Sequence, residues 1–291
     1  MRILHISDLH IGREIDVDRW KKAEQLVEEI TREWGSGEEK PLVLITGDVV
    51  DDGTEIEYIE ARRVLKPLRQ AGFLVVPLPG NHDYGWNGAF ARESRFGLFR
   101  KYLLQIETPV SYPTVPYADP EVTILTLNSM LAETGRWDRL FADGELGREQ
   151  LQGLDRLVTK LHGKREQGHR VVVALHHHPF LFPDDSPVKK AKEQLTHRLK
   201  DGDDLMEIVS GRIDALLFGH EHRHVDFSKP LAGHFLTEEY EIPCILASGR
   251  STDAGLPARV ITIKRGHEPR VKPAPWLSRP RPSTAPERHR R

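Results

Sequence analysis

The sequence predicts an α/β fold, a layered sandwich with its sheets inside and its helices outside. Two observations support this prediction. Short apolar runs of strand length recur along the chain, and polar turns follow them. Stretches with apolar residues at helical spacing alternate with the earlier runs, while the last third of the chain is rich in strand-like runs.

Eight apolar runs are expected to be strands. They are RILHI (2–6), LVLIT (42–46), FLVVPL (73–78), VTILTL (122–127), VVVAL (171–175), DALLF (214–218), CILA (244–247) and RVITI (259–263). Helices are expected over residues 19–34, 54–70 and 147–162, because each stretch carries an apolar stripe along one helical face. The polar residues 182–210 are expected to form a loop and an amphipathic helix between two strands.

One domain is expected over residues 1–268, followed by a disordered tail over residues 269–291. The tail is rich in Pro, Arg and Ser, with few apolar residues to bury. It holds seven Lys and Arg residues and one acidic residue. Such a tail can contact phosphate or an acidic partner, but a solvated terminus is the favoured interpretation.

The composition is typical of a soluble, cytoplasmic protein. Hydrophobic residues make up 38% of the 291 residues and charged residues 30%. No apolar stretch approaches the roughly 20 residues that span a bilayer, so no membrane association is expected. The start, MRILHISDLHIG, lacks a secretory signal, and the single cysteine, Cys244, is interpreted as a small core residue in a reducing compartment. A net charge of −2 does not favour a nucleic-acid partner.

Asp, Asn or His residues follow five of the predicted strands directly. One such strand end would more often be a turn or a cap, but five in order are hard to obtain by chance. In open α/β sheets, ligands gather beyond the carboxyl ends of the strands. These residues are Asp8, His10, Asp48, Asn81, His82, Asp83, His176, His177, His178, His220 and His222.

The residue types predict divalent metal ions. Carboxylate, imidazole and amide oxygen donors favour Mn, Fe, Co, Ni or Zn, with no thiolate among them. About seven candidate ligands are too many for one tetrahedral ion and suit two ions that share a bridging carboxylate. Two ions roughly 3.5–4 Å apart would clamp a phosphoryl group and generate a hydroxide at neutral pH. The pattern therefore predicts the hydrolysis of phosphate esters.

The same residues resemble the calcineurin-like metallophosphoesterase superfamily, whose signature runs D-x-H, G-D, G-N-H-[DE], H and G-H-x-H. The matching blocks are SDLH (7–10), GDVVD (47–51), GNHD (80–83), HHHP (176–179) and GHEH (219–222). The resemblance spans residue 2 to about residue 264. It implies a four-layer α/β/β/α sandwich with mixed sheets and a binuclear metal centre. By motif position, it assigns the first ion to Asp8, His10, Asp48 and His222. It assigns the second ion to Asp48, Asn81, His176 and His220, with Asp48 as the bridge.

His82 is the motif histidine that the resemblance does not assign to a metal. The resemblance implies that His82 faces the phosphate, where it stabilises charge or protonates the leaving oxygen. The adjacent Asp83 is expected to orient this ring and raise its basicity. The expected mechanism is in-line attack by a metal-bridging hydroxide, with both ions and His82 stabilising the developing charge.

The stretch LHHHPF (175–180) contains three histidines, of which the motif and the strand end both select His176. On an extended chain His177 points to the opposite side, against the layers below, and His178 becomes a neighbour of the site. The other histidines receive structural interpretations: His5 in the core, His224 on the surface, and solvated positions for His162, His169, His197, His234 and His267.

Within the superfamily, the HHHP and GHEH forms and the compact length resemble the bacterial 3′,5′-cyclic AMP phosphodiesterase branch. The stretches LNSMLAE and GELGREQLQGL (144–154) add to this likeness. A small phosphodiester, with a cyclic nucleotide favoured, is the expected substrate, and a broad phosphodi- or phosphomonoesterase is a close alternative. A DNA-repair nuclease is less favoured because only the tail is basic, and a non-catalytic scaffold because no ligand is missing. Specificity is expected from the loops at 87–100, 128–143 and 180–187.

Overall fold

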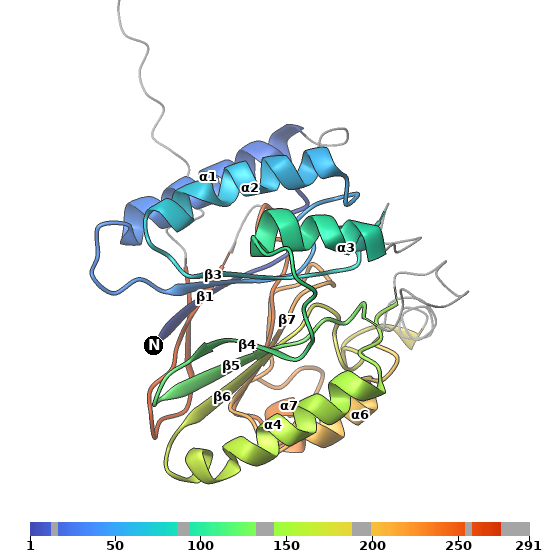
Figure 1. Ribbon diagram of the computed structural model, residues 1–291. Helices are drawn as coiled ribbons and strands as arrows, with labels where there is room; N and C mark the ends of the chain where they lie inside the picture. Colours follow the sequence, from blue (N-terminus) through green and yellow to red (C-terminus); the bar gives the residue numbers. More distant parts are fainter. Residues whose placement is uncertain (13–16, 86–92, 132–142, 188–198, 254–257, 275–291) are drawn as a thin grey trace, which may run out of the picture.

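The computed structural model describes residues 1–12, 17–85, 93–131, 143–187, 199–253 and 258–274. Within these residues, two mixed sheets face each other between two outer layers of helices (Figure 1). One sheet has the strand order β11-β10-β1-β2-β3, and the other has the order β4-β5-β6-β7-β9-β8. The predicted four-layer α/β/β/α sandwich with mixed sheets is confirmed.

The first sheet has antiparallel strands at one edge only, and the second sheet has them at both edges. In the first sheet β1 (Arg2–Ile6), β2 (Leu42–Thr46) and β3 (Val75–Leu78) are parallel, and β10 (Arg259–Thr262) and β11 (Arg270–Pro273) follow as antiparallel pairs. In the second, β5 (Val122–Thr126), β6 (Arg170–Ala174), β7 (Ala215–Phe218) and β9 (Cys244–Ala247) are parallel, with β4 (Thr114–Ala118) and β8 (Val225–Asp226) at the edges. Every predicted strand is present within two residues of its expected bounds.

The strand β2 shows why the predicted strands are apolar throughout. Leu42 and Leu44 pack between the two sheets, whereas Val43 and Ile45 pack beneath the outer helices. Successive side chains of a strand point to opposite faces, and in this sandwich both faces are covered. All five residues of β2 are therefore buried.

The helices cover the outer faces of the two sheets (Figure 1). Helices α1 (Val17–Trp34), α2 (Glu55–Gln70) and α3 (Glu93–Phe99) lie over the first sheet, and α4 (Arg148–Glu166), α6 (Gly202–Val209) and α7 (Leu236–Glu239) over the second. Helix α2 begins with a capping box, in which Thr54 and Glu57 satisfy each other's backbone amides. No helix among the described residues is both long and apolar enough to cross a bilayer.

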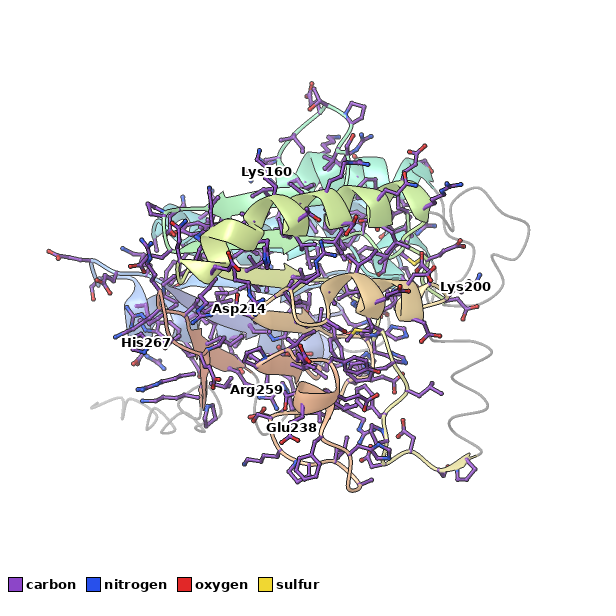
Figure 2. The ribbon with its side chains drawn as sticks, turned by 90° about the horizontal axis from the view of Figure 1, so that it is seen from below. Lys160, Lys200, Asp214, Glu238, Arg259 and His267 are labelled. Atoms are coloured by element: carbon purple, nitrogen blue, oxygen red, sulfur yellow. The ribbon has the colours of Figure 1, made fainter. Side chains whose placement is uncertain are left out.

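Asp214, labelled in Figure 2, ties α4 to the second sheet. Its buried carboxylate accepts hydrogen bonds from Arg165 Nε at 3.1 Å, Arg170 Nη1 at 2.7 Å and the Val171 amide at 2.8 Å. A buried carboxylate requires such partners, because loss of hydration would otherwise destabilise the fold. This network lies at the amino end of β7, away from the predicted metal ligands.

The boundary of the predicted tail needs correction. Residues 270–273 of the expected tail form β11, which pairs with β10 from Arg259–Pro273 to Thr262–Arg270. Three of the four side chains of β11 are exposed, so the strand is held by backbone hydrogen bonds that composition does not reveal. The rest of the tail, residues 275–291, lies outside the described residues. The sequence also fails to predict β4 and α3, which have no clear periodicity.

Candidate dimetal active site

The seven predicted metal ligands lie together at the carboxyl ends of the strands. Asp8, His10, Asp48 and His222 form one group of converging donor atoms, and Asp48, His176 and His220 form a second. The Asn81 side-chain oxygen joins the second group, 3.0 Å from His176 Nε2 and 3.1 Å from His220 Nδ1. Asp48 belongs to both groups, which is the arrangement expected of a bridge.

The bridging geometry depends on one oxygen of Asp48. Asp48 Oδ2 lies 3.7 Å from His10 Nε2 in the first group and 3.3 Å from His176 Nε2 in the second. Within the first group, His222 Nε2 lies 3.1 Å from His10 Nε2 and 3.4 Å from Asp8 Oδ1. Nitrogen and oxygen donors therefore surround two adjacent positions and share one carboxylate between them.

The protonation of these donors fits two divalent ions. The Thr46 carbonyl can only accept, so His176 Nδ1, 2.7 Å away, carries a ring proton. Burial would lower the pKa of His176, but Asp48 and Asp8 raise it to about 9, so an ion bound at Nε2 would displace a proton. Burial alone would raise the pKa of Asp48, but His176 and neighbouring imidazoles hold it well below its usual value. Burial holds the pKa of His220 well below its usual value. An ionised carboxylate and a neutral imidazole are the forms that bind a metal.

The glycines of the motifs make room for the ligands. A β-carbon on Gly47 would overlap the His176 ring, and one on Gly80 would overlap the Asp48 carboxylate. Gly47 also has a φ of 91°, which other residues rarely adopt. The G-D and G-N pairs are thus required by the close approach of backbone to ligand.

Five ligands sit on left-handed backbone, an uncommon conformation for residues other than glycine. Hydrogen bonds between neighbouring strand ends hold it, including Asp8 N to Gly47 O at 3.1 Å and His10 N to Asp48 O at 3.0 Å. A strained backbone conformation persists only where surrounding contacts hold it in place, and such conformations are concentrated at functional sites. The five residues and their φ values are Asp8 (53°), His10 (44°), Asp48 (49°), His220 (74°) and His222 (51°).

His82 lies beside the first donor group on its open side. Its ring centroid is 4.6 Å from that of His10, and its side chain is 18% exposed, against 2% for His10. The His82 amide donates to Asp48 Oδ1 at 3.0 Å. The ring does not belong to the two groups that share Asp48, but it forms a further group of converging donors with His10 and Asp51.

Asp51, which is not among the predicted site residues, orients His82. The Asp51 carbonyl accepts from His82 Nδ1 at 2.7 Å, and its carboxylate accepts from His10 Nδ1 at 2.9 Å. One residue therefore fixes both the ring of a predicted ligand and the ring of the predicted catalytic histidine. The sequence feature that could have indicated a role for Asp51 is its place at the end of the motif GDVVD, four residues before α2 begins at Glu55.

The expected role of Asp83 needs correction. Its buried carboxylate accepts from the amides of Gly80 at 2.8 Å, Val50 at 3.2 Å and Val49 at 3.3 Å. Burial and the nearby charge of Asp48 raise the pKa of Asp83 to about 7. Asp83 therefore joins the loops after β2 and β3, while the contact with the His82 ring is made by Asp51.

The three consecutive histidines all lie near His220. His177 does not face the layers below, because the chain bends at residues 176 and 177 and strand alternation is lost. Its Nδ1 is hydrogen-bonded to Ser129 Oγ at 2.7 Å, and its ring lies 4.4 Å from the His220 ring. His178 stacks on His220 at 5.6 Å and lies 3.9 Å from the Glu221 carboxylate. Both rings therefore pack against His220, and His178 and Glu221 form a further group of converging donors with it.

Of the remaining histidines that the structure describes, His169 contradicts its prediction and His224, expected on the surface, is only half-buried. His169 was expected to be solvated but is buried, hydrogen-bonded to Thr123 Oγ1 at 2.9 Å and to the Pro120 carbonyl. His5 lies in the core as expected, and burial lowers its pKa to about 3. His224 is half-buried, His162, His234 and His267 are exposed, and His197 lies outside the described residues. Burial raises the pKa of Cys244 to about 12, in line with the core position predicted for it.

Comparison with known proteins agrees with this site. A sequence model of the calcineurin-like phosphoesterase family matches residues 1–224. The chain is 25% identical over 241 residues to the 3′,5′-cyclic adenosine monophosphate phosphodiesterase CpdA of Haemophilus influenzae, covering 78% of this chain and 71% of that protein. A dimetal phosphatase from Danio rerio shares the fold, with a TM-score of 0.61 and 14% identity over 93% of this chain and 98% of that one. The chain therefore belongs to the calcineurin-like phosphoesterase family and is a metal-dependent phosphoester hydrolase.

Proposed function

We propose that this chain is a phosphodiesterase that hydrolyses cyclic nucleotides. The observation that carries the proposal is the pair of donor groups sharing Asp48, with His82 on their open side. Two adjacent cation positions suit a phosphoryl group, and His82 is placed to act on one of its oxygens. The likeness to CpdA, whose name specifies 3′,5′-cyclic AMP, supports a cyclic nucleotide as the substrate.

The seven donor residues would hold two divalent ions, and Mn, Fe, Co, Ni or Zn suits their oxygen and nitrogen atoms. When bound, such ions withdraw charge from a phosphoryl group and lower the pKa of water toward neutrality. The Asp51 carbonyl fixes the His82 ring by accepting a hydrogen bond from Nδ1, which leaves Nε2 to contact the substrate. Protonated there, Nε2 can donate to the leaving oxygen, which is general acid catalysis.

The test compares substrates on one preparation of protein loaded with Mn²⁺. The substrates are 3′,5′-cyclic AMP, 2′,3′-cyclic AMP, bis(p-nitrophenyl) phosphate, p-nitrophenyl phosphate and single-stranded DNA. We expect kcat/KM for a cyclic nucleotide to exceed that for the monoester by about tenfold or more. The variant Asp48→Asn, prepared in the same way, controls for contaminating hydrolases.

Each other outcome identifies a different function. Hydrolysis of both nitrophenyl esters without a cyclic nucleotide would replace the proposal by a broad phosphodi- or phosphomonoesterase. Preference for DNA would replace it by a nuclease. Absence of any diester hydrolysis with two ions bound per chain would overturn the phosphodiesterase itself.

A further inference from the structure

The strand β9 brings a cation to the same end of the second sheet. Arg250 follows β9, and its Nη2 lies 2.9 Å from His222 Nδ1 and 3.4 Å from His222 Nε2. The side chain is only 17% exposed, and its Nε has no hydrogen-bond partner in the described part of the chain. The nearest carboxylate contact, to Asp253, is 4.0 Å long. The guanidinium is therefore held at the site with donor capacity left over.

The backbone around Arg250 is fixed by the loops that carry the metal ligands. The Ser251 amide donates to the Ser7 carbonyl at 2.9 Å, and the Ser7 amide donates to Ser251 Oγ at 3.0 Å. On the other side, the Gly249 amide donates to His224 Nδ1 at 3.1 Å. The backbone of Arg250 is thus anchored between the loop that carries Asp8 and the loop that carries His222, and this fixes the point from which its side chain extends.

The guanidinium of Arg250 lies beside a predicted metal ligand. Its Nη2 approaches both ring nitrogens of His222, and His222 Nε2 is the nitrogen that faces His10 and Asp8. A guanidinium only donates hydrogen bonds and cannot itself bind a cation. Arg250 therefore lies next to the first donor group without belonging to it.

A substrate phosphate is the acceptor best placed to receive the hydrogen bonds of Arg250. His222, at 35% exposure, and His82, at 18%, are the most open side chains around the first donor group, so they mark the side from which substrate arrives. Arg250 lies against the first of them. Arginine presents a planar fork of donors that matches two oxygens of a phosphate.

We propose that Arg250 binds a non-bridging oxygen of the substrate phosphate beside the ion held by His222. The proposal rests on the phosphoesterase reaction, but it does not depend on the substrate being a cyclic nucleotide. Binding of inorganic phosphate tests it directly, so a failure of the cyclic-nucleotide assignment and a failure of this role give different results.

The experiment uses the metal-loaded protein and the variants Arg250→Ala and Arg250→Lys. Arg265→Ala, an exposed arginine at the opposite end of the sheets, is the matched control. Metal content is measured by mass spectrometry, the Kd of inorganic phosphate by calorimetry, and KM and kcat with bis(p-nitrophenyl) phosphate. Circular dichroism verifies that each variant is folded.

We expect two ions per chain in all variants. The Kd of phosphate should rise about tenfold or more in Arg250→Ala and less in Arg250→Lys, which keeps the charge but loses the fork. KM should rise in parallel, and Arg265→Ala should match the parent protein. An unchanged Kd for phosphate in Arg250→Ala overturns the proposal. So does loss of an ion from that variant, because Arg250 would then support His222 rather than the substrate.

Discussion

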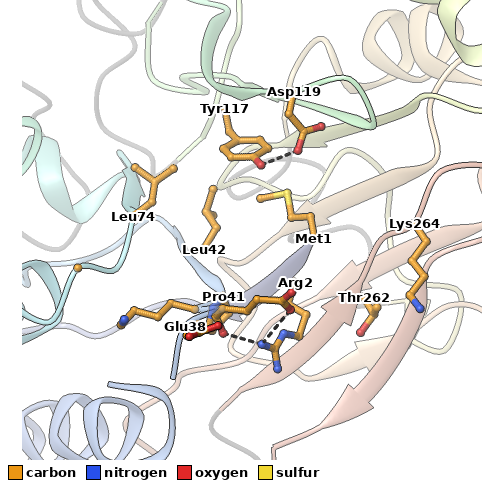
Figure 3. Close-up of a pocket in the computed structure, with 13 residues that line it drawn as sticks. Met1, Arg2, Glu38, Pro41, Leu42, Leu74, Tyr117, Asp119, Thr262 and Lys264 are labelled. Carbon is orange, nitrogen blue, oxygen red and sulfur yellow. Dashed lines mark hydrogen bonds and ion pairs between the residues drawn. The ribbon is translucent and has the colours of Figure 1, made fainter. Parts of the chain in front are cut away.

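The two ends of the paired sheets differ in how they use their polar groups. At the carboxyl ends, side chains from five loops point toward one another and form two donor groups that share Asp48. At the amino ends there is a hollow of about 610 Å³, lined in part by Arg2, Leu42, Leu74 and Tyr117 (Figure 3). In that hollow Arg2 Nη2 donates to the Glu39 carbonyl at 2.6 Å, and Tyr117 donates to Asp119 at 2.6 Å.

The difference shows that a hollow does not by itself make an active site. In the amino-end hollow Arg2 and Tyr117 are each hydrogen-bonded to an adjacent residue, and none of the metal-binding groups among the described residues lies there. At the carboxyl ends, by contrast, buried donors face one another across short distances on left-handed backbone. The carboxyl ends therefore differ from the amino ends in two ways: their donor atoms converge, and the backbone that carries them is strained.

The largest effect is expected from Asp48→Asn. Both donor groups depend on this carboxylate, and a neutral amide binds a cation far less well. We expect the variant to lose both ions and to have no measurable phosphodiester hydrolysis, as judged by mass spectrometry and turnover of bis(p-nitrophenyl) phosphate. The same change in the amino-end hollow, Asp119→Asn, is the control, and this variant should keep two ions per chain and its hydrolytic activity. Two retained ions in Asp48→Asn would contradict the assignment of the bridge.

A smaller effect is expected from His82→Ala. The ring belongs to neither of the two donor groups that share Asp48, although it forms a further group with His10 and Asp51. We therefore expect metal content to stay at two ions per chain. Loss of a positioned acid should lower kcat by about 10²–10⁴-fold. Unchanged turnover at full metal content would remove His82 from the mechanism.

A still smaller effect on metal binding and turnover is expected from Asp51→Asn. The amide can still accept from His10 Nδ1, but it loses the charge that strengthens this bond. Partners that orient metal-binding histidines typically contribute about 10–100-fold in metal affinity or activity. Metal titrations and kcat measure the effect, and Asp52→Asn, whose carboxylate belongs to none of the donor groups, is the control. Equal behaviour of the two variants would show that the Asp51 carboxylate does not position the His10 ring.

Residue type and strand position predicted most of this site, but contacts made by the backbone escaped the prediction. The strand LVLIT was placed at its observed bounds, and the turns after five strands supplied all seven donors. Asp51 was missed because its carbonyl, which no pattern of residue types reports, holds His82. His177 was misplaced because a bend after β6 removes the alternation of a strand. Arg250 was missed because the end of β9 carries no metal-binding residue type.

The smallest effect is expected from Arg2→Ala in the amino-end hollow. Its contact with the Glu39 carboxylate is 3.8 Å long and open to solvent, and such surface pairs contribute about 0–1 kcal/mol. Urea unfolding should therefore show a change of about 1 kcal/mol or less, with metal content and kcat/KM unchanged. The two ends are joined by continuous strands, since β1 begins at Arg2 and ends two residues before Asp8. If Arg2→Ala lowered turnover more than a few-fold, β1 would transmit changes from one end to the other, and the separation of the two ends would fail.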